Sequence, residues 1–198
     1  MTALLGEGFE SALMACSLIV ILPGLATAMA ARAAAIPALS AYGFAVLALS
    51  WLRFSDRGGG FEPLLIAVAL AATIVLLLVP QLNRTDLAAI GGGLLAGGAA
   101  AELWRPCVGF EFGEVLNSLP DRGPEGFGLM AVYLAGVLSP LVAFGAVHHL
   151  VPDRILERIE PVWAVGGAVL IGLLSLATAV GLHDELVGQL FRWSLEQQ

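Results

Sequence analysis

The stretch from Pro63 to Asn83, PLLIAVALAATIVLLLVPQLN, contains no Asp, Glu, Lys or Arg. An α-helix needs roughly 20 mostly apolar residues to cross the hydrocarbon core of a bilayer. This stretch is long enough and apolar enough to do so. It therefore predicts a transmembrane helix.

The rest of the chain repeats this pattern. The sequence is 59% hydrophobic and 13% charged, whereas a soluble domain carries about 25% charged residues. We therefore expect an all-α membrane protein with six transmembrane helices, forming a single transmembrane domain over residues 1–198. The expected spans are residues 11–31, 33–52, 63–81, 87–112, 127–149 and 161–182. The fourth span requires that Glu102 and Arg105 be tolerated as a neutralising pair at spacing i,i+3.

The segments outside these spans are short. Residues 1–10 carry Glu7 and Glu10 and no basic residue, which argues against a secretory signal and for a retained first helix. The longest loop is expected from Asn117 to Glu125, which bears Pro and Gly. From Asp184 onward the chain predicts at most a short amphipathic helix, with its apolar side chains at an interface. These side chains are Leu186, Leu190, Phe191 and Trp193.

The net charge of −7 excludes nucleic acid as a partner and electrostatic docking on anionic lipid, because both need a basic surface. All nine basic residues are Arg. Four fall in the loops expected on each side of the membrane, so the positive-inside rule does not choose an orientation.

Two cysteines, Cys16 and Cys107, lie in the first and fourth expected spans. Two thiols and one disulfide differ by two electrons and two protons, so such a pair carries electrons without a bound cofactor. Accordingly, we expect neither cofactor nor metal. Cys107 lies in the run Trp104-Arg105-Pro106-Cys107-Val108-Gly109, and its neighbours make it the candidate for the more reactive thiol.

Proline and glycine predict where the helices break. Pro23-Gly24 falls in the first span, Pro106 and Gly109 flank the cysteine of the fourth, and Pro140 lies in the middle of the fifth. Each proline removes a helix hydrogen bond, and broken helices at membrane depth persist where the freed backbone is buried or lines a wet cavity. These prolines would act as hinges around a polar interior. A simple kink is the alternative for each proline.

Two further patterns predict packing. Gly93 and Gly97 have the small-xxx-small spacing that lets helices approach closely. Hydroxyl side chains inside the spans usually bond back to the carbonyl one turn earlier, so they give no support to a hydrolase. These include Thr27, Thr73, Ser175 and Thr178.

The residues around the second cysteine resemble a known family. Leu94-Leu95-Ala96-Gly97-Gly98, then Trp104 to Gly109, then Gly113-Glu114-Val115-Leu116 are similar to the fourth-helix pattern of the CcdA/DsbD transmembrane electron transporters, G-W-x-P-C-V/I-G followed by G-x-I/V-L. The first helix agrees less well. Where the family has S-P-C followed by L-P-G, this chain has Ala15-Cys16-Ser17, and Leu22-Pro23-Gly24 follows one residue late. The motif resemblance rests mainly on residues 94–116.

The resemblance implies a cytochrome c-type biogenesis protein of the bacterial inner membrane, an oxidoreductase-type electron transporter. Such proteins take electrons from cytoplasmic thioredoxin and pass them by thiol–disulfide exchange to extracytoplasmic thioredoxin-like proteins. It further implies two inverted three-helix repeats with broken helices 1 and 4. Cys16 and Cys107 would be the redox pair. Their supporting residues would be Pro23, Gly24, Trp104, Arg105, Pro106, Gly109 and Pro140.

The chain departs from the family around Cys107, where Glu102, Arg105, Glu111 and Glu114 replace mostly small or apolar residues. Either Arg105 favours the thiolate and the acids line a wet path, or the helix ends near Cys107 and the charges are interfacial. The second alternative is favoured for Glu111 and Glu114.

Other functions stay open. Thiolate and imidazole suit soft metal ions, so a metal-ion or small-solute transporter is one alternative. Its ligands would be Cys16, Cys107, His148, His149 and Glu102 or Glu111. A non-catalytic membrane subunit that binds partner helices is another.

Overall fold

The computed structural model describes residues 1–14, 17–31, 34–55, 62–78, 86–104, 110–150, 153–182, 185, 188–189 and 192. This part of the chain forms nine helices and contains no strand, which confirms the all-α prediction. The helices are α1 Thr2–Ala12, α2 Leu18–Ala31, α3 Ala35–Phe54, α4 Pro63–Leu78, α5 Asp86–Leu103, α6 Phe110–Arg122, α7 Pro124–Val137, α8 Ser139–Leu150 and α9 Asp153–Ala179.

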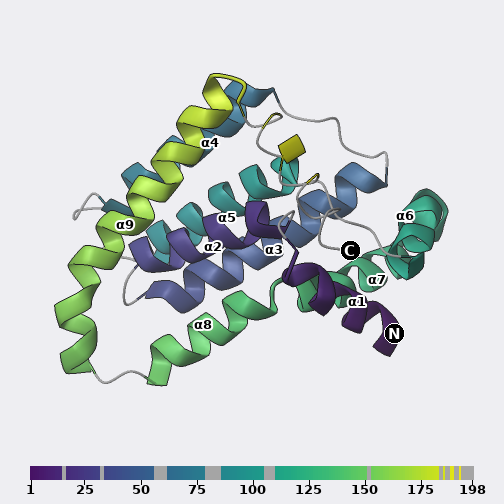
Figure 1. Ribbon diagram of the computed structural model, residues 1–198, viewed down its shortest axis with the longest axis horizontal. Coiled ribbons are helices and arrows are strands. Elements are labelled where there is room, and N and C mark those ends of the chain that lie inside the picture. The colour runs from purple at the N-terminus through teal and green to yellow at the C-terminus, as the bar shows by residue number, and fades with distance from the viewer. Residues whose placement is uncertain are drawn as a thin grey trace.

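The helices form a central group with a smaller group on either side (Figure 1). α2, α3 and α5 pack on one another at the centre. α4 and α9 pack together on one side of them, and α1, α6 and α7 gather on the opposite side (Figure 1). Most of the largest buried side chains, including Trp104, Tyr42, Tyr133 and Phe112, belong to one cluster that joins the centre to the α1–α6–α7 group.

Two of the described helices have the length and apolar composition of a membrane span, or three if one bent pair is counted as a span. α3 and the Pro161–Ala179 part of α9 meet both criteria, and α7 with the first part of α8 meets them if the bent pair is taken as one span. α2 and α4 are apolar but have only 14 and 16 residues. The described helices are thus those of a chain that could cross a membrane, whereas six spans stay a prediction.

The first expected span is not one helix starting at residue 11. α1 begins at Thr2 and ends at Ala12, and α2 begins at Leu18. The predicted break at Pro23 is wrong, because Pro23 lies inside α2. A proline within a helix removes one backbone bond, and packing against neighbouring helices compensates for that loss. α1 and α2 are instead separated earlier in the chain, where the described residues 13, 14 and 17 are not α-helical.

The fourth expected span and the loop after it also differ from the prediction. α5 ends at Leu103, and α6 runs from Phe110 through Pro120 to Arg122. The expected loop from Asn117 to Glu125 is therefore helical over most of its length. Phe112, Val115 and Leu119 recur at helical spacing and are buried, so the burial of this face stabilises a helix where composition indicated a turn. The chain turns instead at Gly123, whose φ of 52° favours glycine.

The fifth expected span bends as predicted. α7 ends at Val137 and the Ser139–Val147 part of α8 leaves it at 55°. Pro140 is the second residue of α8, a position where the missing proline N–H costs no helical bond. The bend at Leu138 thus lies two residues before this proline.

The predicted packing role of the glycines in α5 is confirmed. A Cβ at Gly93 would meet the backbone carbonyl of Ala38, and one at Gly97 would meet that of Tyr42. The α3 and α5 backbones therefore touch at these two positions. α1 and α7 meet in the same way, through Gly8 and Gly136.

The expected hydroxyl bonds are present in three cases. Thr27 donates to the Pro23 carbonyl at 2.7 Å, and Thr73 and Thr178 likewise donate to the carbonyl four residues earlier. Ser175 is different, because it donates to the Ala67 carbonyl of α4 at 2.9 Å. It links α9 to α4.

The helix pairs follow an internal repeat in part. If α1–α4 are taken as one half and α5–α9 as the other, α1 corresponds to α5 and α3 corresponds to α7. The α3–α5 pair then corresponds to the α7–α1 pair, and both pairs pack closely through glycines. By the same correspondence, the α2–α9 pair would have its counterpart in packing between α6 and α4. In the structure, α4 packs along α5 instead. Two inverted repeats therefore stay a prediction.

Candidate functional site

Five of the predicted site residues, Cys16, Arg105, Pro106, Cys107 and Gly109, lie outside the described residues. The structure does describe the chain on both sides of them. Around the first cysteine these flanks are α1 with residues 13 and 14, and Ser17 with α2. Around the second they are α5 with Trp104, and α6. The structure therefore describes the site through the positions of these flanking residues.

Trp104 is the described residue that directly precedes the gap around Cys107. Its side chain is fully buried. The indole stacks on the ring of Tyr133 with centroids 6.3 Å apart and meets Phe54 edge-on at the same distance. Its Nε1 is buried and has no hydrogen-bond partner within the described part of the chain. Trp104 therefore fixes the end of α5 by ring packing.

Tyr133 of α7 contacts the flanks of both cysteines. Its ring lies parallel to that of Phe112, with centroids 3.5 Å apart, and so touches the start of α6 as well as Trp104. Its hydroxyl hydrogen-bonds to the Ser11 hydroxyl of α1 at 2.8 Å. Residues before and after Cys107 and a residue shortly before Cys16 thus meet at one buried side chain.

Two charged side chains hold the helix ends that border residues 105–109. Nη1 of Arg53 donates to the carbonyls of Ala101, Glu102 and Trp104 at 2.9, 2.8 and 3.2 Å. A cation here satisfies the last carbonyls of α5 and offsets the negative end of the helix dipole. At the other border, Oε2 of Glu7 accepts the backbone N–H of Phe112 at 2.8 Å.

The flanks of the two cysteines also share one apolar cluster. Ala12 of α1 and Val20 and Ile21 of α2 belong to the same buried cluster as Trp104 and Phe112. Tyr42 of α3 ties α2 to this cluster by donating its hydroxyl to the Val20 carbonyl. The buried side chains that flank Cys16 and those that flank Cys107 therefore belong to one continuous apolar core.

Pro23, Gly24 and Pro140 are among the described residues, and Gly24 packs against Leu141 of α8. Gly24 is buried so tightly that an added Cβ would lie 2.9 Å from Cε1 of Tyr42 and 3.2 Å from Cδ2 of Leu141. Leu141 follows Pro140 directly, so the structure brings the Pro23-Gly24 pair and the bend of the fifth span together.

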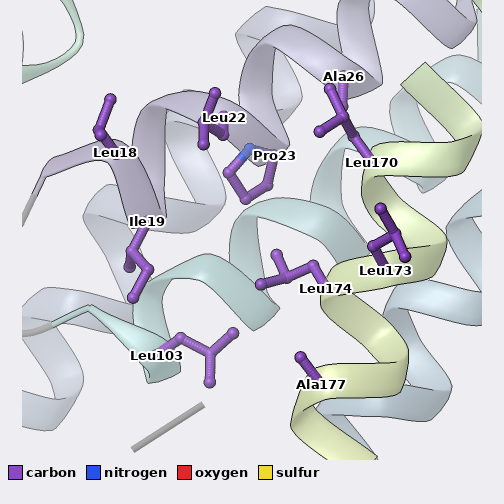
Figure 2. Close-up of a pocket in the computed structure, with 10 residues that line it drawn as sticks. All are labelled: Leu18, Ile19, Leu22, Pro23, Ala26, Leu103, Leu170, Leu173, Leu174 and Ala177. Atoms are coloured by element: carbon purple, nitrogen blue, oxygen red, sulfur yellow. The ribbon is translucent and has the colours of Figure 1, made fainter. Parts of the chain in front are cut away.

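Pro23 also lines an open groove of about 300 Å³ between α2 and α9. Figure 2 shows Pro23 of α2 across the groove from Leu170 and Leu174 of α9. All of its lining side chains are hydrocarbon. The groove adds space beside α2 and no reactive group.

The acidic residues near Cys107 separate into two environments. Glu114 is exposed on α6, whereas Glu102 is buried at the end of α5. The interfacial position of Glu114 stays a prediction. The side chain of Glu111 lies outside the described residues. No group of three His, Cys, Asp or Glu side chains forms within the described part. Of the suggested metal ligands, only the side chain of Glu102 is described, so this finding leaves metal transport open.

Sequence reasoning missed Glu7, Ser11, Arg53 and Tyr133. A hydroxyl or carboxylate within ten residues of Cys16 is a signal that could have singled out Ser11 and Glu7. Arg53 and Tyr133 gave none, because their contacts are with backbone carbonyls and rings far along the chain.

No family model, curated protein or solved structure matches this chain.

Proposed function

We propose that this protein transfers electrons across the bacterial inner membrane by thiol–disulfide exchange, with Cys16 and Cys107 as its redox pair. The observation that supports this most is the convergence at Tyr133. One buried ring contacts Trp104 and Phe112, and its hydroxyl bonds to Ser11.

Covalent geometry limits how far each cysteine extends from these anchors. Consecutive Cα atoms are about 3.8 Å apart, so Cys16 is one such step from Ser17 and Cys107 three from Trp104. A disulfide needs Cα atoms within about 7 Å. The shared cluster of Ala12, Val20 and Trp104 supports a pairing at this range.

The reaction needs no cofactor. A thiolate of a reduced partner attacks the Cys16–Cys107 disulfide, and the mixed disulfide is resolved by the partner's second thiol. The partner leaves oxidised, and the pair holds two electrons and two protons. The pair then reduces a second partner's disulfide by the reverse sequence of steps. In this proposal, the donor is cytoplasmic thioredoxin and the acceptor is an extracytoplasmic thioredoxin-like protein serving cytochrome c maturation or a related reduction.

The proposal includes six spans in two inverted three-helix halves, with the first and fourth spans broken at the cysteines. The breaks between α1 and α2 and between α5 and α6 support this arrangement. Alternating access would use the bend at Leu138, next to Pro140, where α8 also contacts Gly24.

Electron transfer in proteoliposomes tests this function. Vesicles holding the protein enclose an oxidised thioredoxin-like protein, and reduced thioredoxin is added outside. Mass-tagged maleimide then counts the thiols of the enclosed protein. We expect wild type to reduce it and Cys16→Ser and Cys107→Ser to fall to the rate of empty vesicles. Equal rates for wild type and both variants would overturn the proposal.

A further inference from the structure

Tyr133 has two separable sets of contacts. Its ring touches Trp104 and Phe112, which border Cys107, and its hydroxyl touches Ser11, which precedes Cys16 by five positions. The side chain is fully buried. The contacts with Phe112 and Trp104 involve only the ring of Tyr133, whereas the bond with Ser11 involves its hydroxyl. The two cysteine-bearing segments are thus joined through different atoms of one residue.

We propose that Tyr133 is a positioning residue that sets the two cysteine-bearing segments at the separation a disulfide requires, an inference that rests on the proposed redox pair. Its inferred role acts through Ser11 and through the rings of Trp104 and Phe112. The hydroxyl–hydroxyl bond fixes the lateral position of α1. The ring stack fixes the chain on both sides of residues 105–109.

The backbone near Tyr133 supports this role. Gly8 of α1 lies directly against the Tyr133 carbonyl, with no room for a Cβ between them. Gly136, one turn later on α7, lies equally close to the α1 backbone at Leu5 and Phe9. α1 therefore rests on α7 around Tyr133, and the Ser11–Tyr133 bond is a polar contact between these two closely packed helices.

A phenylalanine at position 133 separates the two contributions. Tyr133→Phe keeps a ring of the same shape for Phe112 and Trp104 and removes the bond to Ser11. Ser11→Ala removes the same bond from the other side. Because each variant deletes the same interaction, their effects should overlap in the double variant instead of adding.

The matched control is Ser175→Ala. Ser175 of α9 donates its hydroxyl to the Ala67 carbonyl of α4 at 2.9 Å, and neither α4 nor α9 borders a cysteine-bearing segment along the chain. Its removal deletes a hydroxyl bond between two helices without touching the α1–α7 contact. It therefore reports the effect of losing an interhelical hydroxyl bond as such.

Two measurements on the full-length protein in detergent test the inference. Bridging of Cys16 and Cys107 by dibromobimane reports their proximity and needs no redox partner. Titration with a glutathione buffer reports the stability of their disulfide. A hydrogen bond of ordinary strength corresponds to a factor of roughly three to ten in such an equilibrium. We expect Tyr133→Phe and Ser11→Ala each to weaken the disulfide by that factor and to slow bridging, with Ser175→Ala close to wild type.

The outcomes distinguish this inference from the proposed function. Wild-type values for both Tyr133→Phe and Ser11→Ala would overturn the positioning role, while electron transfer by wild type would still stand. The same follows if Ser175→Ala has as large an effect as they do. Bridging that depends on Tyr133, in a wild-type protein that does not react with thioredoxin, would support positioning and contradict electron transfer. Should Tyr133→Phe fail to fold, Ser11→Ala decides alone. If wild type is not bridged at all, both claims fail.

Discussion

The carboxylate of Glu7 accepts the backbone N–H of Phe112 at 2.8 Å, which joins the first helix to the start of α6. Phe112 is the third residue of α6, where a backbone N–H has no partner within the helix. A carboxylate at this position also offsets the positive end of the helix dipole. Cys107 lies three residues before α6 begins in the sequence, so we expect Glu7 to influence the electrostatics near this thiol.

Glu7→Gln should make Cys107 more reactive. The amide oxygen can still accept the Phe112 N–H, but the negative charge that disfavours a nearby thiolate is removed. In a Cys16→Ser background, we expect maleimide to label Cys107 about two to five times faster near neutral pH, corresponding to the usual strength of a charge at a helix end. Glu10→Gln, which changes an exposed carboxylate of the same helix, is the control. Unchanged or slower labelling in Glu7→Gln would contradict this role.

Arg53→Gln should lower thermal stability. One guanidinium nitrogen satisfies three carbonyls at the end of α5, and lost hydrogen bonds to a charged group cost about 1.5–3 kcal/mol. We expect a clear fall in the apparent unfolding temperature in detergent. Arg122→Gln is the comparison, because Arg122 forms an exposed ion pair with Glu125 at 3.6 Å, and such pairs contribute about 0–1 kcal/mol. Equal shifts for the two variants would show that Arg53 does not support this helix end.

Gly97→Ala should separate α3 from α5. The added Cβ would meet the Tyr42 carbonyl and would lie 3.0 Å from Cβ of Ala45, so one backbone must move. Overpacking of this kind costs about 1–3 kcal/mol. Gly91→Ala on the same helix is matched to it, since its Cβ would lie at an ordinary 3.5 Å from Leu76 Cδ1. We expect a reduced unfolding temperature only for Gly97→Ala; equal stability of the two variants would disprove the close contact.

Gly8→Ala should displace α1 from α7. Its Cβ would meet the Tyr133 carbonyl, whereas a Cβ at Gly6 of the same helix would have nothing within 4 Å. Alanine favours helix over glycine by about 1 kcal/mol, so Gly6→Ala should be neutral or stabilising. We expect Gly8→Ala to slow dibromobimane bridging of the two cysteines and Gly6→Ala to leave it unchanged. Similar bridging in both variants would mean that the seating of α1 does not control the site.

Local rules predicted much of this fold correctly. The spacing of Gly93 and Gly97 predicted close helix packing, Thr27 and Thr73 bond back within their own helices, and the fifth span bends beside Pro140. In each case the cause lies within one turn of the residue itself. Such effects can be inferred from one sequence.

The features that organise the site could not be predicted in this way. The break after Ala12 contains neither Pro nor Gly in residues 13–17, so no residue type marks it. α6 passes through Pro120 because its apolar face is buried, which depends on α7. Arg53 binds backbone carbonyls. Because every residue has a backbone carbonyl, the residue types in the sequence do not identify the partners of Arg53. These contacts arise from tertiary packing and require the structure.

Thiol trapping in membranes tests the central claim most directly. Wild type, Cys16→Ser and Cys107→Ser are labelled with mass-tagged maleimide before and after reduced thioredoxin is added. We predict that wild type holds an intramolecular disulfide that thioredoxin opens, and that one single variant accumulates a mixed disulfide with thioredoxin. Two thiols that remain free under oxidising conditions and do not respond to thioredoxin would contradict the account and make metal or solute transport the leading alternative.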